Sequence, residues 1–170
     1  MRYPSLIVVL AMLGALALFV WRARPANRLH RLFALQILSF STWTLGVAGL
    51  YNGSDHFDIW GGLCFAGASL IPSAFLAFVH YYPPESRWPS RTVIRAAVLI
   101  GILFALMSVS TSWIVTDFEW RSGELWRRPG PLYGLFAVYF LAVWGQGAIL
   151  IFVKWRRARG VEHLHLKYLT

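Results

Sequence analysis

Five long apolar segments run through this chain of 170 residues, and they limit the folds that it can adopt. The segments cover residues 4–21, 32–51, 59–82, 96–115 and 132–153. A helix needs roughly 20 residues to cross a hydrocarbon core about 30 Å thick. In lipid only helices and closed barrels satisfy their backbone polar groups, and the alternating pattern of barrel strands is not seen here. The sequence therefore predicts an all-α, polytopic bundle of five spanning helices, which occupies residues 1–153.

Basic residues are concentrated in three regions, which follow the first, third and fifth apolar segments. The loop at residues 52–58 contains no Lys or Arg, and the loop at residues 116–131 is neutral. Loops on the cytoplasmic side of a membrane carry the excess of Lys and Arg. We therefore expect the N-terminus outside and the C-terminus in the cytoplasm. The arginines expected to lie near anionic lipid headgroups are Arg22, Arg24, Arg28, Arg31, Arg156, Arg157 and Arg159.

In a soluble protein, the net charge of +9 would suggest a nucleic-acid partner, since phosphate contacts need clustered Lys and Arg. Here the arginines occupy the ends of apolar segments, and 58% of all residues are hydrophobic. The lipid bilayer with its anionic headgroups is therefore the expected partner, and no nucleic acid is expected.

The third segment combines small residues with one proline. Gly62, Ala66 and Ser69 fall at helical spacings that let a neighbouring backbone approach closely, which is how helices associate in lipid. Pro72 has no N–H for the carbonyl of Ala68, and its ring crowds that carbonyl, so we expect a kink. A kink of this kind can be a signalling hinge or a packing feature, and the sequence leaves both open.

Two tryptophans lie near the middle of the second and fifth segments, where an indole N–H needs a partner. Trp43 has Ser39 one helical turn away, and Trp144 has Gln146 close by. These four side chains are candidates for lining a small ligand pocket among the helices. They are also what hydrogen bonding between helices would require.

Side chains that perform catalysis or hold metals are sparse. No Asp, Glu, Lys or Arg lies in the middle of a segment, although pumps and coupled transporters usually need one there. The sequence contains no GxSxG, HExxH or phosphate-binding glycine motif. Cys64 is the only cysteine, and His163 and His165 point to different sides of a helix. We therefore expect no catalytic residue, no metal and no cofactor.

Several short stretches share an order and spacing with a known family. They are Ala26-Asn27-Arg28, Trp43, Leu70–Phe78 with Tyr82-Pro83, Gly130–Tyr133, and Arg159-Gly160 followed by Leu164, Leu166, Lys167, Tyr168 and Leu169. Together they resemble the N-terminal seven-transmembrane region of bacterial sensor histidine kinases. The resemblance spans nearly the whole chain.

This resemblance implies a multi-pass protein of the bacterial inner membrane that receives a signal for a two-component system. In that family two more spanning helices follow, and then cytoplasmic modules that include an ATP-binding domain. We therefore expect the basic segment at residues 154–170 to lie in the cytoplasm and to lead towards a missing sixth helix. Histidine kinases work as dimers, so a homodimer is a further expectation.

Two functions of different class are consistent with these residues. The first is a membrane-embedded sensor module, an incomplete N-terminal part of a histidine kinase with no catalytic residues of its own. Val161-Glu162-His163-Leu164 lacks the acidic residue that directly follows the phosphorylated histidine in that family. The second is a self-contained five-helix membrane protein with a transport, assembly or structural role. The reading frame downstream of Thr170 distinguishes the two.

Overall fold

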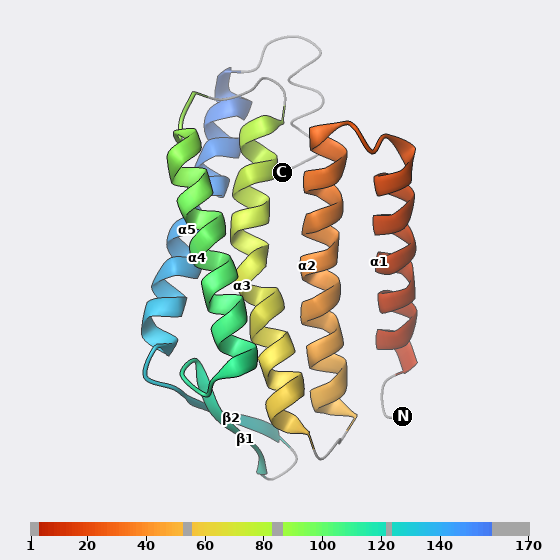
Figure 1. Ribbon diagram of the computed structural model, residues 1–170, viewed down its shortest axis with the longest axis vertical. Coiled ribbons are helices and arrows are strands. Elements are labelled where there is room, and N and C mark those ends of the chain that lie inside the picture. Colours follow the sequence, from red (N-terminus) through yellow and green to blue (C-terminus); the bar gives the residue numbers. More distant parts are fainter. Residues whose placement is uncertain (1–3, 53–55, 83–86, 122–123, 158–170) are drawn as a thin grey trace.

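The computed structural model describes residues 4–52, 56–82, 87–121 and 124–157 (Figure 1). Its elements are α1 (Pro4–Ala23), α2 (Arg28–Tyr51), α3 (Phe57–Tyr81), α4 (Arg91–Ser110), β1 (Val115–Arg121), β2 (Glu124–Pro129) and α5 (Tyr133–Arg157). All five helices are long and apolar enough to cross a membrane. The prediction of five helices of spanning length is therefore confirmed.

Polar caps place the helix ends at positions that hydrophobicity alone does not indicate. Asn27 accepts a hydrogen bond from the N–H of Leu29 at 2.9 Å, and α2 begins at Arg28 rather than at residue 32. Ser90 caps α4 in the same way, so α4 begins at Arg91 rather than at residue 96. The backbone becomes extended directly after Ser110, which ends α4 before the predicted residue 115.

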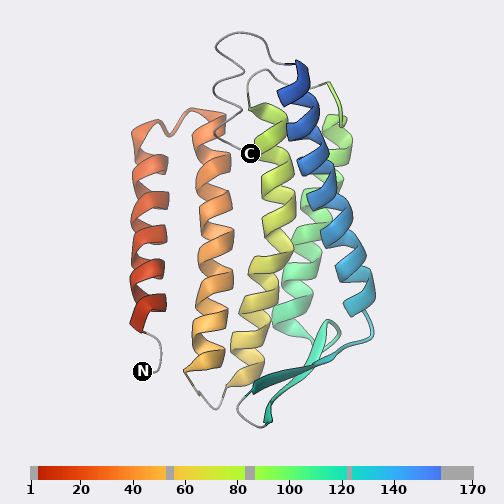
Figure 2. The ribbon, with the colours of Figure 1, turned by 180° about the vertical axis from the view of Figure 1, so that it is seen from behind.

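Helix α3 lies at the centre of the bundle, with α2, α4 and α5 packed around it (Figures 1 and 2). Helix α1 lies at the edge and packs on α2. The N-terminal end of α1 and the two strands lie at one end of the bundle. The C-terminal ends of α1, α3 and α5 lie at the other end, so the three basic regions begin on the same side (Figure 1).

Small residues of α3 let two neighbouring helices approach closely. A Cβ atom at Gly67 would collide with the backbone of Trp43 in α2. On the α4 side, a Cβ atom at Gly62 would come within 2.8 Å of the carbonyl oxygen of Ser108. Ala66 is also buried, with 7% of its surface exposed. The small residues therefore face protein rather than lipid along this part of α3.

Aromatic rings fill the core between α3, α4 and α5. The ring of Phe136 meets Phe65 edge-on, with 5.6 Å between centroids, and meets Phe104 edge-on at 5.8 Å. The ring of Tyr139 lies 5.3 Å from that of Phe104. Edge-on and tilted pairs at these separations are favourable contacts. The cluster fixes α5 against α3 next to the site described below.

An antiparallel hairpin of β1 and β2 connects α4 to α5. In its register Phe118 pairs with Arg127, and the ring of Phe118 packs directly on Gly61 of α3. The N–H of Gly130 donates to the carbonyl of Ile114 at 2.8 Å and closes the base of the hairpin. The charge pattern predicts only a neutral loop at residues 116–131, so this small sheet is an addition to the predicted helical bundle.

Candidate functional site

A groove lies between α2 and α5, with α3 as its floor and the hairpin at one end. Its volume is about 580 Å³, which is in the range of small-molecule sites. Helices α2 and α5 each pack on α3 and not extensively on one another, so the groove opens sideways between them. The residues that line it are Trp43, Leu50, Cys64, Phe65, Ala68, Phe118, Arg127, Tyr133, Phe136, Ala137, Phe140 and Leu141.

Arg127 is the one charged residue in this lining. Its Nη2 donates a hydrogen bond to the hydroxyl of Tyr133 at 2.8 Å. Its guanidinium carbon lies 5.3 Å from the centre of the Tyr133 ring and 5.8 Å from the centre of the Phe65 ring. Contacts of this kind hold a cation over an aromatic face. The hairpin therefore places one positive charge at the end of an otherwise uncharged groove.

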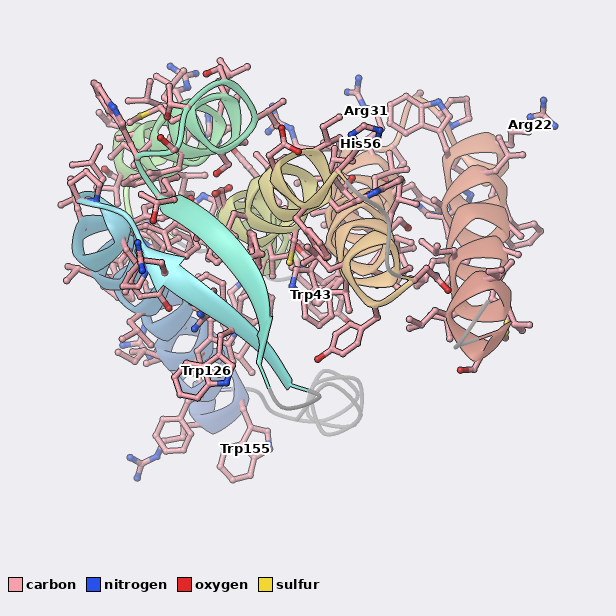
Figure 3. The ribbon with its side chains drawn as sticks, turned by 90° about the horizontal axis from the view of Figure 1, so that it is seen from below. Arg22, Arg31, Trp43, His56, Trp126 and Trp155 are labelled. Atoms are coloured by element: carbon pink, nitrogen blue, oxygen red, sulfur yellow. The ribbon has the colours of Figure 1, made fainter. Side chains whose placement is uncertain are left out.

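Among the four residues predicted for a ligand pocket, only Trp43 lines this groove. Figure 3 shows Trp43 projecting from α2 on the side towards which the hairpin extends. The ring of Trp144 stacks on Phe75 of α3, with 6.3 Å between centroids. The hydroxyl of Ser39 donates to the carbonyl of Leu35 in its own helix at 2.9 Å, and Gln146 is half-buried on α5.

A polar crossing joins α5 to α3 and α4 within the apolar core. The hydroxyl of Tyr139 shares its proton between the carbonyl oxygens of Ser69, at 3.0 Å, and Ala97, at 3.2 Å. A Cβ atom at Gly101 would come within 2.5 Å of this hydroxyl, so the glycine leaves the space that the oxygen occupies. Tyr139 and Ser69 are both buried. One side chain of α5 is thus bonded to the backbone of two other helices.

Pro72 lies within a turn of this crossing. Helix α3 continues as one helix through Pro72, which is fully buried. The proline offers no N–H to the carbonyl of Ala68, and the next carbonyl, that of Ser69, accepts from Tyr139. The hydroxyl of Ser73 donates to the carbonyl of Leu70 at 3.1 Å. Side-chain hydroxyl groups therefore donate hydrogen bonds to carbonyls of α3 at the level where Pro72 removes a backbone hydrogen bond.

Lys154 forms a second link between α5 and α3, near the basic end of the bundle. Only 7% of its surface is exposed. Its Nζ donates to the carbonyl oxygens of Val79 at 2.7 Å, His80 at 3.3 Å and Tyr82 at 2.6 Å. These carbonyls end α3, where the backbone runs out of its own partners. The charge pattern places Lys154 at the start of a cytoplasmic segment, whereas here it is a buried residue of α5, which continues to Arg157.

The arginines expected near lipid headgroups lie on the surface where the structure describes them. Arg22, Arg24, Arg28, Arg31, Arg156 and Arg157 are exposed, and Arg159 lies outside the described residues. The guanidinium group of Arg28 lies 4.4 Å from the centre of the Tyr81 ring. That of Arg156 lies 5.4 Å from the centre of the Phe152 ring. Figure 3 shows Arg22 and Arg31 pointing outward from the bundle.

A second cavity, of about 350 Å³, lies where the hairpin meets the ends of α3 and α4. Asp58, Ser108 and Thr116 are among its polar lining residues. Within the described residues, no group of three or more His, Cys, Asp or Glu side chains is placed to hold a metal ion.

Arg127 and Lys154 are the site residues that sequence reasoning misses. Polar and apolar residues alternate from Asp117 to Arg121, just before Ser122-Gly123, which is the pattern of a strand followed by a turn, although residues 124–128 around Arg127 do not alternate. That signal was available in the sequence. Lys154 carries no comparable signal, because its inward direction depends on where α3 ends relative to α5.

The comparisons with known proteins give one match. The sequence model of a family described as the N-terminal 7TM region of histidine kinase matches residues 5–168. No curated protein and no solved structure matches the chain. The match covers nearly all 170 residues and agrees with the five helices of spanning length. The chain belongs to the family of N-terminal seven-transmembrane regions of histidine kinases.

Proposed function

We propose that this chain is the incomplete membrane sensor of a bacterial two-component histidine kinase. Membership of the family and five helices of spanning length support a sensory module in the membrane. The family region has seven spans by its description, whereas the described part of this chain contains five. We infer that the parent protein supplies two further spans and the cytoplasmic kinase domains. Residues 154–170 lead towards those spans, and the chain contributes no catalytic residue.

The proposed location is the inner membrane, with the N-terminus and the hairpin outside. The support is the charge pattern, since the regions that follow α1, α3 and α5 are rich in Lys and Arg. Exposed arginines at that end, such as Arg22 and Arg156, would contact anionic headgroups at the cytoplasmic surface. A homodimer of the parent protein is part of the proposal, as the resemblance to histidine kinases implies.

The observation that carries a sensory role is the groove between α2 and α5. A ligand in this groove would contact α2, α3 and α5 together, so its binding would favour one packing of these helices over another. Two packings that differ by about a few kcal/mol suffice for such a switch. Tyr139 and Lys154 bond α5 to the backbone of α3 at two levels. A shift of α5 would therefore reach the end of the bundle that leads to the kinase domains.

Autophosphorylation of the parent protein tests this role. Ala137 lines the groove, and its neighbour Val138 is exposed on α5 outside it. In proteoliposomes with labelled ATP, Ala137→Phe fills the groove and is expected to change the rate of autophosphorylation. Val138→Phe is expected to leave that rate unchanged. Equal rates for the wild type and both variants would contradict a sensory groove.

The second candidate function remains a self-contained five-helix protein with a transport, assembly or structural role. The gene downstream of Thr170 separates it from the first. Two further apolar segments followed by an ATP-binding domain are expected for the sensor. A stop codon directly after Thr170 would support the second candidate.

A further inference from the structure

The groove between α2 and α5 combines an apolar wall with a single cation. Apart from Arg127, its lining consists of aliphatic and aromatic side chains, one thiol and one phenol. The aromatic rings of Phe136 and Phe140 belong to α5, and that of Trp43 belongs to α2. Apolar walls of this kind bind the apolar body of a ligand, while a few polar groups fix its orientation.

Arg127 is the group that would fix the position of the polar end of such a ligand. Among the side chains that the structure describes, its guanidinium group contacts the hydroxyl and the ring of Tyr133 and the ring of Phe65. None of these is a carboxylate. Asp58 is the only Asp or Glu residue whose side chain the structure describes, and it lines the second cavity at the ends of α3 and α4. The guanidinium group has five N–H donors, of which the Tyr133 hydroxyl takes one. The remaining donors suit an anionic group that accepts two hydrogen bonds.

The opening of the groove indicates where such a ligand comes from. Trp43, with 41% of its surface exposed, and Leu141, with 68%, stand at its rim. Both belong to helices of membrane-spanning length, so in a bilayer the opening between α2 and α5 would lie at the depth of the acyl chains. Arg127 belongs to β2 of the hairpin, which lies at one end of the bundle (Figure 1). A molecule that lies in one leaflet can enter this groove sideways.

We propose that the groove binds a single-chain amphiphile with an anionic head, of the class of a long-chain carboxylate. The head accepts hydrogen bonds from Arg127 beside Tyr133, and the chain runs along Phe136, Phe140 and Leu141. The charge of Arg127 would repel a cationic amphiphile, and a neutral one would lack the negative charge that strengthens hydrogen bonds to a guanidinium group. This inference deepens the proposed sensory function by naming the class of ligand.

Photolabelling of the 170-residue protein in phosphatidylcholine nanodiscs tests the proposal without any kinase domain. The probe is hexadecanoate that carries a diazirine in its chain, and the labelled peptides are identified by mass spectrometry. Label is expected on the peptides that contain Trp43 and residues 133–141. Unlabelled hexadecanoate is expected to compete at lower concentration than hexadecanol, since only the carboxylate forms charge-assisted hydrogen bonds with Arg127.

Two pairs of variants make the test specific. Arg127→Gln is expected to raise the competing concentration of hexadecanoate about tenfold or more, because a hydrogen bond to a charged group is lost. Arg128→Gln, the neighbour on the same strand that does not line the groove, is expected to change it by about twofold at most. Ala137→Phe is expected to abolish labelling, whereas Val138→Phe preserves it. The melting temperature of each variant shows that it is folded.

Several results would overturn the proposal. They are equal competition by hexadecanol, equal effects of Arg127→Gln and Arg128→Gln, and better competition by a two-chain anionic phospholipid. Loss of Arg127-dependent labelling in the longer parent protein would assign the groove to further helices. Loss of labelling on dimerisation would assign it to a second copy. Because the assay contains no kinase, its failure leaves the sensory function open, and the autophosphorylation test decides that separately.

Discussion

The ammonium group of Lys154 lies 2.7 Å from the carbonyl oxygen of Val79, so that a side chain of α5 caps the end of α3. The last four carbonyls of a helix have no partner within the helix. A cation is favoured there by the helix dipole as well as by hydrogen bonding. Lys154 thereby joins the central helix to the last described helix, through backbone atoms that no substitution in α3 removes.

Replacing Lys154 by Met should destabilise the bundle. The change keeps an unbranched apolar stem but removes the hydrogen bonds to Val79, His80 and Tyr82. We expect a loss of about 1–3 kcal/mol in the free energy of unfolding, because buried carbonyls lose a charged donor. The measurement is thermal unfolding in detergent micelles. Arg157→Met, at an exposed position of the same helix end, is the control, and an equal melting temperature for the two variants would contradict the cap.

Tyr139→Phe isolates the polar crossing, because it removes one hydroxyl and keeps the ring. The backbone carbonyls of Ser69 and Ala97 lose a donor from α5. We expect a destabilisation of about 0.6 kcal/mol, which is typical of hydrogen bonds between helices in lipid. Denaturant unfolding in mixed micelles measures it. Tyr133→Phe, which removes a hydroxyl bonded to the exposed Arg127, is expected to have a smaller effect, and the reverse order would argue against the crossing.

The helices could be predicted from the sequence, because the signals that indicate them are local. The same holds for the positions at which a helix can be approached closely. Length and apolarity define the spans, and small residues such as Gly62 mark a close contact wherever their neighbour lies. The first residues of α2 and α4 were harder to predict. Asn27 and Ser90 cap these helices, so that each begins with charged residues that a hydrophobic pattern omits. The hairpin was not predicted: the residues from Asp117 to Arg121 alternate as a strand does, but Leu125-Trp126 and Arg127-Arg128 break the pattern, and the charge balance indicates only a neutral loop.

The candidate site was harder to predict, because it depends on which helices meet. Trp43 lines the groove, but Ser39 satisfies its hydroxyl within its own helix, as serines in lipid often do. Arg127 reaches the groove only because the hairpin lies over the end of α3. Lys154 is buried only because α3 ends beside it. Such placements follow from tertiary packing, which neither spacing nor composition records.

Gly62→Leu should weaken the packing of α3 on α4. A Cβ atom at Gly62 would come within 2.8 Å of the carbonyl oxygen of Ser108, which is a backbone atom and cannot rotate away. We expect a destabilisation of about 1–3 kcal/mol, as for other overpacked sites. Gly145→Leu is the matched control, since a Cβ atom there would meet no other helix within 4 Å. Thermal unfolding of both variants in one detergent would show a lower midpoint for Gly62→Leu alone if α4 packs as described.

The proposed orientation predicts which end of the bundle a reagent outside the cell can reach. Ala26 lies in the turn after α1 among Arg22, Arg24 and Arg28, whereas Ser112 lies at the hairpin end. Both residues are exposed, and Cys64 can be replaced by Ser to leave a single introduced thiol. In intact spheroplasts a membrane-impermeant maleimide should label Ser112→Cys, and it should label Ala26→Cys only after lysis. This follows because arginine-rich loops stay in the cytoplasm during insertion. A reporter active only in the cytoplasm, fused after Thr170, should give signal in the same cells. Labelling of Ala26→Cys before lysis, with a silent reporter at Thr170, would reverse the orientation and place Arg127 at the cytoplasmic leaflet.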